Sequence, residues 1–321
     1  MNLSRRLATA ALAVVATVAV VVPVTATSVA QAAPVPAPAA LTPVKLNKKV
    51  PVVYVASAIE TAQLAETFAT PMRLRGYDVH VFLTKDDSDP ANNPFYSIRG
   101  NSAKLGRYVA ALSKKTGQKK FDVVGASQTG LVTRYWLKYY GGQKFARNVV
   151  LLSGIIKGSP YQAQWLRQGK CPPADRLQYL PKQYRKVNPT PACEEEAMGS
   201  KVVNALNTPR EALPGIKYFN ITTLQEEEAA PYWINLMSGP GNYRNIITQD
   251  LCPNDPVVHI TMTLQPSMQS LVDSALRGGP VKMDCMVPVI PGAPTLKDTI
   301  KVLKSPPGVK LPPGYKVPAG F

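Results

Sequence analysis

The residues best suited to chemistry lie in the hexapeptide GASQTG, residues 125–130. β-Branched residues before it predict a buried strand at 121–124, and apolar residues at helical spacing after it predict a helix. A serine on such a strand-to-helix turn is exposed for nucleophilic attack, and the amide of the next residue helps to hold an oxyanion. Ser127 is therefore a candidate nucleophile and Gln128 a candidate oxyanion donor. The alternative is that Ser127 only caps the helix.

A serine at its ordinary pKa needs a general base, and the chain holds two histidines. His80 precedes Ser127 and falls in a predicted strand, which favours a structural role. His259 follows the last predicted strand and precedes the last predicted helix, where the base is expected if the order is serine, acid, histidine. We predict that His259 is the base, the alternative being a loop histidine without a catalytic role.

The acid should follow a strand between the nucleophile and the base. Three consecutive glutamates come after the strand-forming residues 216–222, and one of them would orient the imidazole: Glu226, Glu227 and Glu228. At least two of the three would then be solvated. Asp250 and Asp255 are alternatives by residue type, although Asp255 lies in a turn just before the histidine and is more typical of a structural residue.

The elements that must position these residues alternate along the chain between short β-branched runs and helical periodicities, the pattern of a parallel sheet covered by helices. Strands are predicted at 52–55, 77–83, 121–124, 149–152, 216–222 and 245–248, and helices around 64–74, 105–112, 131–139 and 271–276. We therefore predict an α/β fold over residues 50–278, with a mainly parallel central sheet and helices on both faces.

The remaining segments indicate a secreted protein. Residues 1–32 combine Arg5 and Arg6, an apolar run and a small-residue cleavage site, as a secretory signal does; a membrane anchor is the alternative. Residues 33–49 are typical of a Pro/Ala-rich linker, 159–214 of a loop-rich excursion over the sheet, and 279–321 of a proline-rich C-terminal extension. No transmembrane segment is expected in the mature form.

Four cysteines lie outside the predicted signal and form an even set, which fits disulfides in an oxidising compartment. Three pairings exist on paper. Short spacing favours Cys171 with Cys193 and Cys252 with Cys285. A zinc site would need closer pairs. A serine nucleophile with a histidine base needs neither a metal nor an organic cofactor, and we predict neither.

The formal net charge is +17, and removal of residues 1–32 takes away two arginines and no acid, which leaves +15. Such a charge favours contact with an anionic cell-envelope surface. Nucleic acid is not expected as a partner, because the lysines are scattered and no recognition motif accompanies them.

The chain resembles the secreted class 2 lipases of actinobacteria, relatives of the small Bacillus lipase, over about residues 50–278. The resemblance is carried by the stretches 51–55 (PVVYV), 97–100 (SIRG), 121–130 (FDVVGASQTG), 135–142 (YWLKYYGG) and 249–255 (QDLCPND). It implies an α/β-hydrolase fold and ester hydrolysis through an acyl-enzyme, with Ser127 as nucleophile and His259 as base. Glu226 falls on the family's aspartate, and the amides of Ala58 and Gln128 fall on its oxyanion donors.

Three departures from the family pattern matter for activity. The family's His-Gly after the first strand is here Ala56-Ser57, in the loop that supplies an oxyanion N–H. The last glycine of G-x-S-x-G is Thr129, which needs a local adjustment because a β-branched residue replaces glycine beside strained backbone. The acid is glutamate. Two hypotheses follow: a secreted serine hydrolase acting on lipid or small carboxylic esters, or a catalytically impaired lipase-like protein that binds a lipid, envelope component or protein partner.

Overall fold

The computed structural model describes residues 50–84, 97–170, 191–300 and 308–317. The predicted signal and linker, residues 1–32 and 33–49, and Cys171 lie outside the described residues. No helix in the described parts of the chain is long and apolar enough to cross a membrane.

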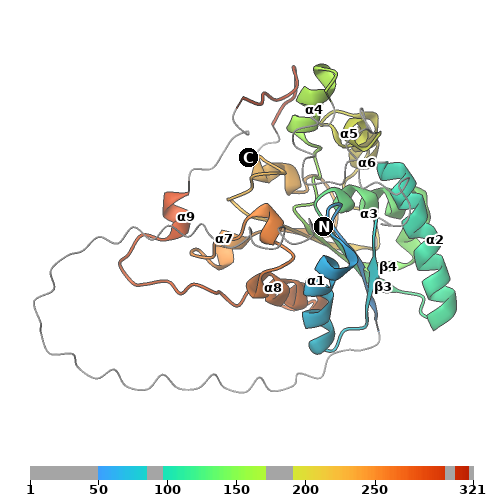
Figure 1. Ribbon diagram of the computed structural model, residues 1–321, viewed down its shortest axis with the longest axis horizontal. Coiled ribbons are helices and arrows are strands. Elements are labelled where there is room, and N and C mark those ends of the chain that lie inside the picture. Colours follow the sequence, from blue (N-terminus) through green and yellow to red (C-terminus); the bar gives the residue numbers. More distant parts are fainter. Residues whose placement is uncertain (1–49, 85–96, 171–190, 301–307, 318–321) are drawn as a thin grey trace, which may run out of the picture. The chain divides into compact units, whose positions relative to one another are not determined.

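A parallel sheet forms the centre of the fold (Figure 1). Its six strands within the described residues are β1 Val52–Val55, β2 Val79–Phe82, β3 Phe121–Ala126, β4 Ala146–Leu152, β5 Lys217–Thr222 and β6 Tyr243–Ile247. The strand order is β2-β1-β3-β4-β5-β6, and every neighbouring pair is parallel. The predicted fold class is confirmed.

Helices cover both faces of the sheet (Figure 1). The four long ones are α1 Ala62–Leu74, α2 Ile98–Thr116, α3 Gln128–Tyr139 and α8 Pro266–Arg277. Buried side chains of α2 and α3 form one core with the sheet, and those of α1 and α8 form the other. Successive strand residues point to opposite faces, so Val53 and Val55 belong to the first core and Val52 and Tyr54 to the second. A strand buried on both faces must be apolar throughout, as β1 is.

Local capping fixes where the helices begin and end. Thr61 accepts a hydrogen bond from the amide of Leu64 at the start of α1, and Ser97 accepts one from Gly100 at the start of α2. Helix α2 ends at Gly117, whose φ of 71° is the left-handed conformation that glycine adopts without strain.

The excursion 159–214 is more regular than predicted. It contains α4 Pro160–Arg167, α5 Pro191–Glu196 and α6 Lys201–Asn207. Ser159 caps α4 and Ser200 caps α6. The many prolines of this segment led to the prediction of loops, but Pro160 lies in the first turn of α4, where proline favours a helix.

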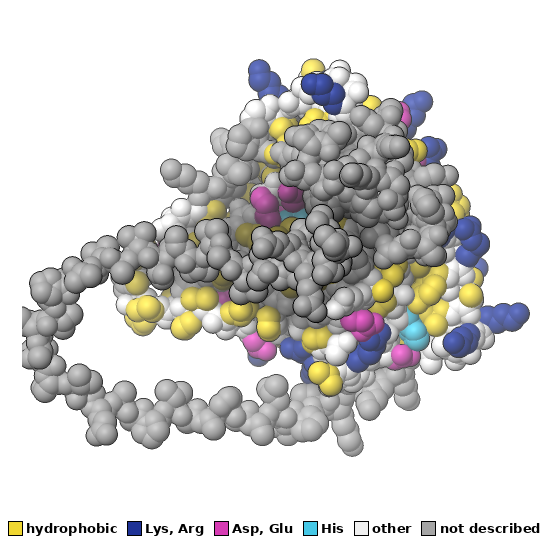
Figure 2. Space-filling view, viewed as in Figure 1, with side chains coloured by type: hydrophobic (Ala, Val, Ile, Leu, Met, Phe, Trp, Pro, Cys, Tyr) yellow, Lys and Arg dark blue, Asp and Glu magenta, His cyan; other side chains and the backbone are white. Residues whose placement is uncertain are grey.

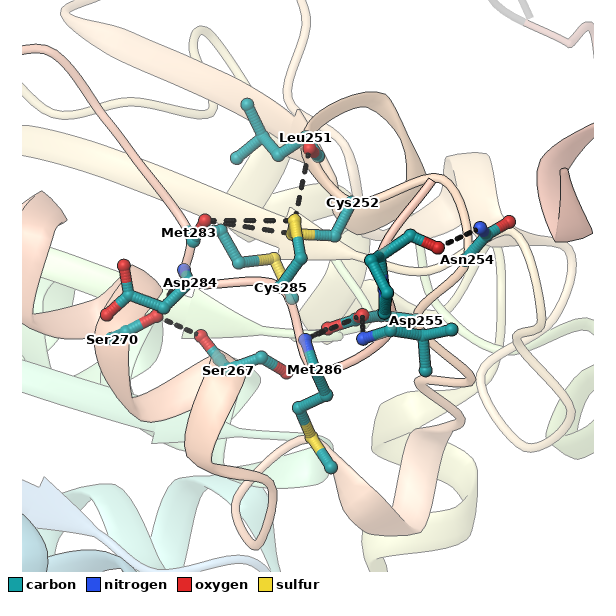
Figure 3. The surroundings of a disulfide bond; sticks show 12 residues. Leu251, Cys252, Asn254, Asp255, Ser267, Ser270, Met283, Asp284, Cys285 and Met286 are labelled. Atoms are coloured by element: carbon teal, nitrogen blue, oxygen red, sulfur yellow. Dashed lines mark hydrogen bonds between the residues drawn. A yellow bond between two sulfur atoms is a disulfide. The ribbon is translucent and has the colours of Figure 1, made fainter. Parts of the chain in front are cut away.

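The C-terminal extension is attached to the domain through the predicted disulfide between Cys252 and Cys285, with Cα atoms 5.3 Å apart (Figure 3). Beside it, the Asp255 carboxylate accepts hydrogen bonds from the amides of Met286 and Val287. The extension also contains one short helix, α9 Leu296–Thr299. Cys193 is disulfide-bonded as well, and its predicted partner, Cys171, lies outside the described residues.

Candidate active site

Ser127 lies on a sharp turn between β3 and α3. Its backbone has φ 57° and ψ −134°, a conformation that non-glycine residues rarely adopt, and its amide donates to the carbonyl of Leu152 at the end of β4 (2.8 Å). The side chain makes no capping hydrogen bond to the helix. The helix-cap alternative is therefore wrong, and the hydroxyl is left to interact with other groups.

Thr129 stabilises this turn. Its buried hydroxyl accepts a hydrogen bond from the amide of Ala126 (2.9 Å) and lies 2.8 Å from the carbonyl of Val55, to which it can donate. The glycine that the tight packing requires is Gly130, because a Cβ there would lie 2.5 Å from the Cα of Gly154. Compared with G-x-S-x-G, the glycine that packs closely against another backbone segment thus lies one residue later, at Gly130. Thr129, at the usual glycine position, makes hydrogen bonds instead.

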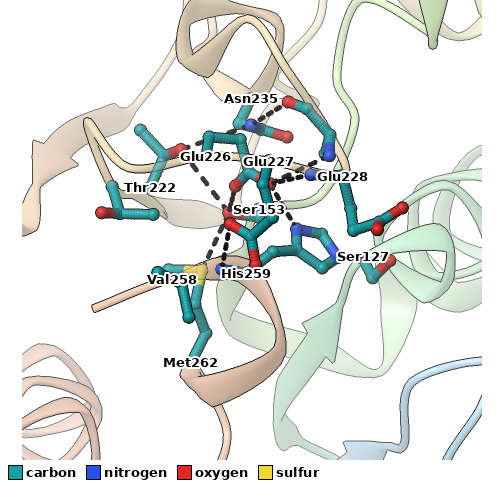
Figure 4. Close-up of polar contacts among 12 residues, drawn as sticks. Ser127, Ser153, Thr222, Glu226, Glu227, Glu228, Asn235, Val258, His259 and Met262 are labelled. Carbon is teal, nitrogen blue, oxygen red and sulfur yellow. Dashed lines mark hydrogen bonds and ion pairs between the residues drawn. The ribbon is translucent and has the colours of Figure 1, made fainter. Parts of the chain in front are cut away.

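His259 lies between the serine and an acid (Figure 4). It begins the short 3-10 helix η6 His259–Thr261, which follows β6 and α7 Thr248–Leu251 and precedes α8. Its Nε2 lies 2.9 Å from Ser127 Oγ, and its Nδ1 lies 2.6 Å from Glu226 Oε1. The side chain is only 10% exposed.

Glu226 is the one of the three glutamates that contacts the imidazole. Its side chain is fully buried. Besides His259, it accepts hydrogen bonds from Ser153 Oγ (2.5 Å) and from the amide of Ala229 (2.9 Å). Glu227 is exposed and accepts instead from the backbone amide of His259 (2.9 Å), and Glu228 is exposed.

The electrostatics of this pair favour an ionised Glu226 and a basic His259. Burial acts to raise the pKa of Glu226, but the charge of His259 and the hydrogen bonds at the carboxylate lower it overall. Burial acts to lower the pKa of His259, but Glu226, with smaller contributions from Glu227 and Glu228, raises it well above 6.5. A more basic imidazole accepts a proton from the serine hydroxyl more readily.

The loop of residues 56–60, which carries the predicted oxyanion donor Ala58, follows β1. A single buried carboxylate, that of Glu60, accepts from the amide of Ser57 (2.8 Å), Tyr54 Oη (2.6 Å) and Thr263 Oγ1 (2.8 Å). Neither the amide of Ala58 nor that of Gln128 donates a backbone hydrogen bond to another described residue. Both amides are therefore available beside the serine, and Glu60 fixes the loop that carries one of them.

No protein-family model matches the sequence, and a search of curated proteins gave no match. Among solved structures, Aspergillus fumigatus lipase B is similar with a TM-score of 0.55 and 19% sequence identity, over 77% of this chain and 56% of that one. The fold is that of the α/β-hydrolases. The chain spans little more than half the length of the Aspergillus protein. The resemblance to secreted class 2 lipases stays a prediction.

Two further solved structures have lower TM-scores. Bacillus licheniformis lipase BlEst2 in its mature form has a TM-score of 0.45 at 16% identity, over 63% of this chain and 84% of that one. The RedJ thioesterase of the prodiginine pathway of Streptomyces coelicolor has a TM-score of 0.46 at 15% identity, over 77% and 96%.

A cavity of about 340 Å³ lies beside the Ser127–His259 contact. Ser127, His259, Ala58 and Gln128 all line it. The apolar lining residues besides Ala58 are Ile59, Leu64, Ala126, Leu152, Ile155, Ala229, Ile260, Met262 and Leu264. The polar ones besides Ser127, His259 and Gln128 are Ser57, Glu60, Gln162, Glu196, Glu228 and Thr263. Figure 2 shows acidic side chains beside a histidine in the hollow at the centre of the face it presents. The site therefore combines an apolar wall with a few polar groups at the base.

The other residues that the sequence analysis considered lie elsewhere. His80 on β2 contacts Asp78 (3.0 Å), and Asp250 pairs with Lys297 (2.6 Å). Asp255 serves the C-terminal extension, as described above. Of the acids considered, Glu226 alone contacts the imidazole ring of His259, whereas Glu227 contacts its backbone amide.

Three polar residues of the site were missed by the sequence analysis: Ser153, Glu60 and Glu196. Ser153 follows β4 with a φ of 44° and holds Glu226. The sequence did contain a signal for Ser153, since it is a polar residue directly after a buried strand. Active-site residues gather at the carboxyl ends of parallel strands. Glu60 and Glu196 belong to acidic positions that no motif distinguishes from solvated ones.

Proposed function

We propose that the protein is a serine hydrolase that cleaves carboxylic esters through an acyl-enzyme. The observation that carries the proposal is the continuous hydrogen-bonded series Glu226, His259, Ser127 at the base of an apolar cavity. Each donor–acceptor distance is within hydrogen-bonding range. The serine lies on strained backbone beside the amides of Ala58 and Gln128, neither of which donates to another residue in the described part of the chain.

In the proposed reaction, Ser127 Oγ attacks the ester carbonyl carbon while His259 Nε2 takes the hydroxyl proton. Glu226 keeps the imidazole oriented through Nδ1–H and stabilises the imidazolium. The negative oxygen of the tetrahedral intermediate lies against the amides of Ala58 and Gln128. The intermediate collapses, the alcohol leaves with the proton from His259, and a water molecule then releases the acid by the same sequence of steps.

The substrate class we propose is a lipid or small carboxylic ester. The apolar wall of the cavity suits an acyl chain, and burial of its methylenes would contribute about 0.8 kcal/mol each. The protein of similar fold from Aspergillus fumigatus is a lipase, lipase B. The bonded cysteines fit an oxidising compartment, and with the N-terminal pattern they support secretion.

The experiment is labelling of the purified, oxidised protein with a fluorophosphonate, followed by intact mass and peptide mapping. We expect one adduct, on Ser127, lost in Ser127→Ala and strongly slowed in His259→Ala. His80→Ala removes the other histidine, which lies outside the site, and should label at the wild-type rate. Absence of an adduct in folded protein would contradict the proposal and would favour the lipase-like binding protein instead.

A further inference from the structure

Glu196, the last residue of α5, is a buried carboxyl group that the proposed reaction does not use. The residue is 4% exposed and lines the cavity that contains Ser127 and His259. Its Oε2 accepts a hydrogen bond from Gln128 Nε2 (3.0 Å). The excursion thus contributes a carboxyl group to the wall of an otherwise mainly apolar pocket.

The surroundings of Glu196 differ from those of the other buried carboxylates. Three of them are paired with a lysine or an arginine: Asp122, Glu195 and Glu211. Glu226 is paired with His259. Glu60 accepts hydrogen bonds from three residues, and Asp255 accepts them from two. Within the described part of the chain, Glu196 forms no ion pair and accepts from a single neutral side chain. Burying a carboxyl group with so little compensation costs stability.

A second polar atom at the same place lacks a partner. Gln128 is 3% exposed, and its Oε1 is buried without a hydrogen bond to any described residue. Gln128 is also the residue whose amide is an oxyanion donor in the proposed mechanism. Gln128 directly follows Ser127 in the chain, and Gln128 and Glu196 both line the cavity that a bound ester would enter.

We propose that Glu196 determines specificity in this pocket by accepting a hydrogen bond from a hydroxyl group of the ester substrate. This inference rests on the proposed hydrolase function and adds to it the chemical class of the substrate, an ester that carries a hydroxyl near the scissile bond. A site with a buried acceptor binds an analogue that lacks the donor poorly, because the acceptor is then left unpaired in the complex.

A neutral hydroxyl fits this environment better than a cation. Burial raises the pKa of Glu196 to about 7, with Gln128 and His259 acting to lower it. Near neutral pH the group therefore exists in both protonation states. A carboxyl group in either state can accept from a hydroxyl, whereas an ammonium group needs the ionised form.

The experiment measures kcat/KM for pairs of esters in which a methyl group replaces a hydroxyl of similar size. On the alcohol side the pair is ethylene glycol monobutanoate and propyl butanoate; on the acyl side it is methyl β-hydroxybutanoate and methyl isovalerate. We expect the wild-type protein to prefer the hydroxylated ester in one pair by ~10-fold, the effect of one hydrogen bond in a buried site. Glu196→Leu should lose this preference while still cleaving the methyl analogue.

Two further variants make the result specific. Glu194→Leu changes an exposed carboxylate of the same helix and should keep the wild-type preference. Glu196→Gln keeps a carbonyl acceptor and should retain part of it. Fluorophosphonate labelling of Ser127 in each variant shows that the site is intact.

Equal rates within both wild-type pairs overturn the inference, even if Glu196→Leu fails to fold. A hydroxyl preference that persists in a labelled Glu196→Leu protein also overturns it. A third contradictory result is a wild-type preference for choline butanoate over its uncharged analogue, neohexyl butanoate, that Glu196→Gln abolishes. This result would mean that Glu196 binds a cationic group of the substrate. Failure of the hydrolase proposal is a different result, in which neither member of any pair is cleaved and Ser127 does not label.

Discussion

At the scale of single residues, the site is built around a glutamate where the resembled family has an aspartate. The longer side chain reaches His259 because Ser153 and the amide of Ala229 hold both of its oxygens. Asn235 supports this arrangement, donating to the carbonyl of Ala229 (3.0 Å) and accepting from the amide of Ile155 (2.9 Å). A glutamate side chain has one more rotatable bond than an aspartate. Hydrogen bonds from the segments after β4 and β5 restrict its conformation here.

Replacing this acid tests its role. We expect Glu226→Gln to lower kcat by ~10³–10⁴-fold, because the imidazole loses its orienting carboxylate. Asp250→Asn, which changes an exposed acid outside the site, should have no such effect. Steady-state kinetics on a chromogenic ester measures both, and a loss of less than tenfold in Glu226→Gln would mean that Glu226 is not the acid.

The pH profile of wild-type kcat/KM is a separate prediction. The reaction needs neutral His259, whose pKa lies well above 6.5 because Glu226 stabilises the protonated form. Activity should therefore rise through alkaline pH. In Glu226→Gln the negative charge is absent, so the midpoint of the residual activity should move to lower pH. An unchanged midpoint would show that Glu226 does not set the basicity of His259.

At the scale of elements, the loop of residues 56–60 carries Ala56-Ser57 where the resembled family has His-Gly. Hydrogen bonds to Glu60 still hold this loop in place. Glu60 joins this loop to β1 through Tyr54 and to the segment after η6 through Thr263. One carboxylate therefore couples the element that carries the Ala58 amide to the element that carries His259. The Thr129 hydroxyl contributes in the same way, linking the end of β1 to the nucleophile turn.

Loosening the loop should affect the transition state more than substrate binding. We expect Glu60→Ala to lower kcat by ~10²-fold with little change in KM, since one oxyanion donor loses its position. Glu60→Gln should recover part of the loss because its amide can replace some of the hydrogen bonds. Glu66→Ala, an exposed change on α1, is the matched control. An equal rise in KM for Glu60→Ala would indicate a general structural effect instead.

At the scale of the whole molecule, the C-terminal extension is part of the domain that holds His259. The Cys252–Cys285 disulfide and the Asp255 carboxylate fasten residues 285–287 to the loop between α7 and η6 (Figure 3). The covalent link spans 33 residues and encloses His259 and all of α8.

Removing this link should destabilise the protein. We expect the double variant Cys252→Ala/Cys285→Ala to lose about 3–4 kcal/mol of unfolding free energy, because a closed loop of this length restricts the unfolded chain. Urea unfolding followed by tryptophan fluorescence measures the change. The wild-type protein and the Asp284→Ala variant, which both keep the disulfide, provide the reference. An unchanged urea midpoint in the double variant would contradict this account.

The sequence by itself determined the layered architecture and the order of the reacting groups. Val52–Val55 is apolar throughout, and Phe121–Ala126 is mainly apolar around the ion-paired Asp122, as expected of strands buried on both faces, so their positions could be predicted closely. The candidate residues Ser127 and His259 could be selected because the fold constrains their order and the chain has few histidines. The pairing of Cys252 with Cys285 followed from spacing.

Only the tertiary structure decided which acid faces the imidazole and which polar groups complete the site. The residue pattern does not distinguish Glu226, Glu227 and Glu228, and the family resemblance implied Glu226. In the structure the turn after β5 buries Glu226 and exposes the other two. Glu60 and Glu196 come from segments far apart in the chain, and their burial depends on what folds over them. Local patterns record the periodicity of single elements, whereas side-chain partners across elements arise from packing that no local pattern contains.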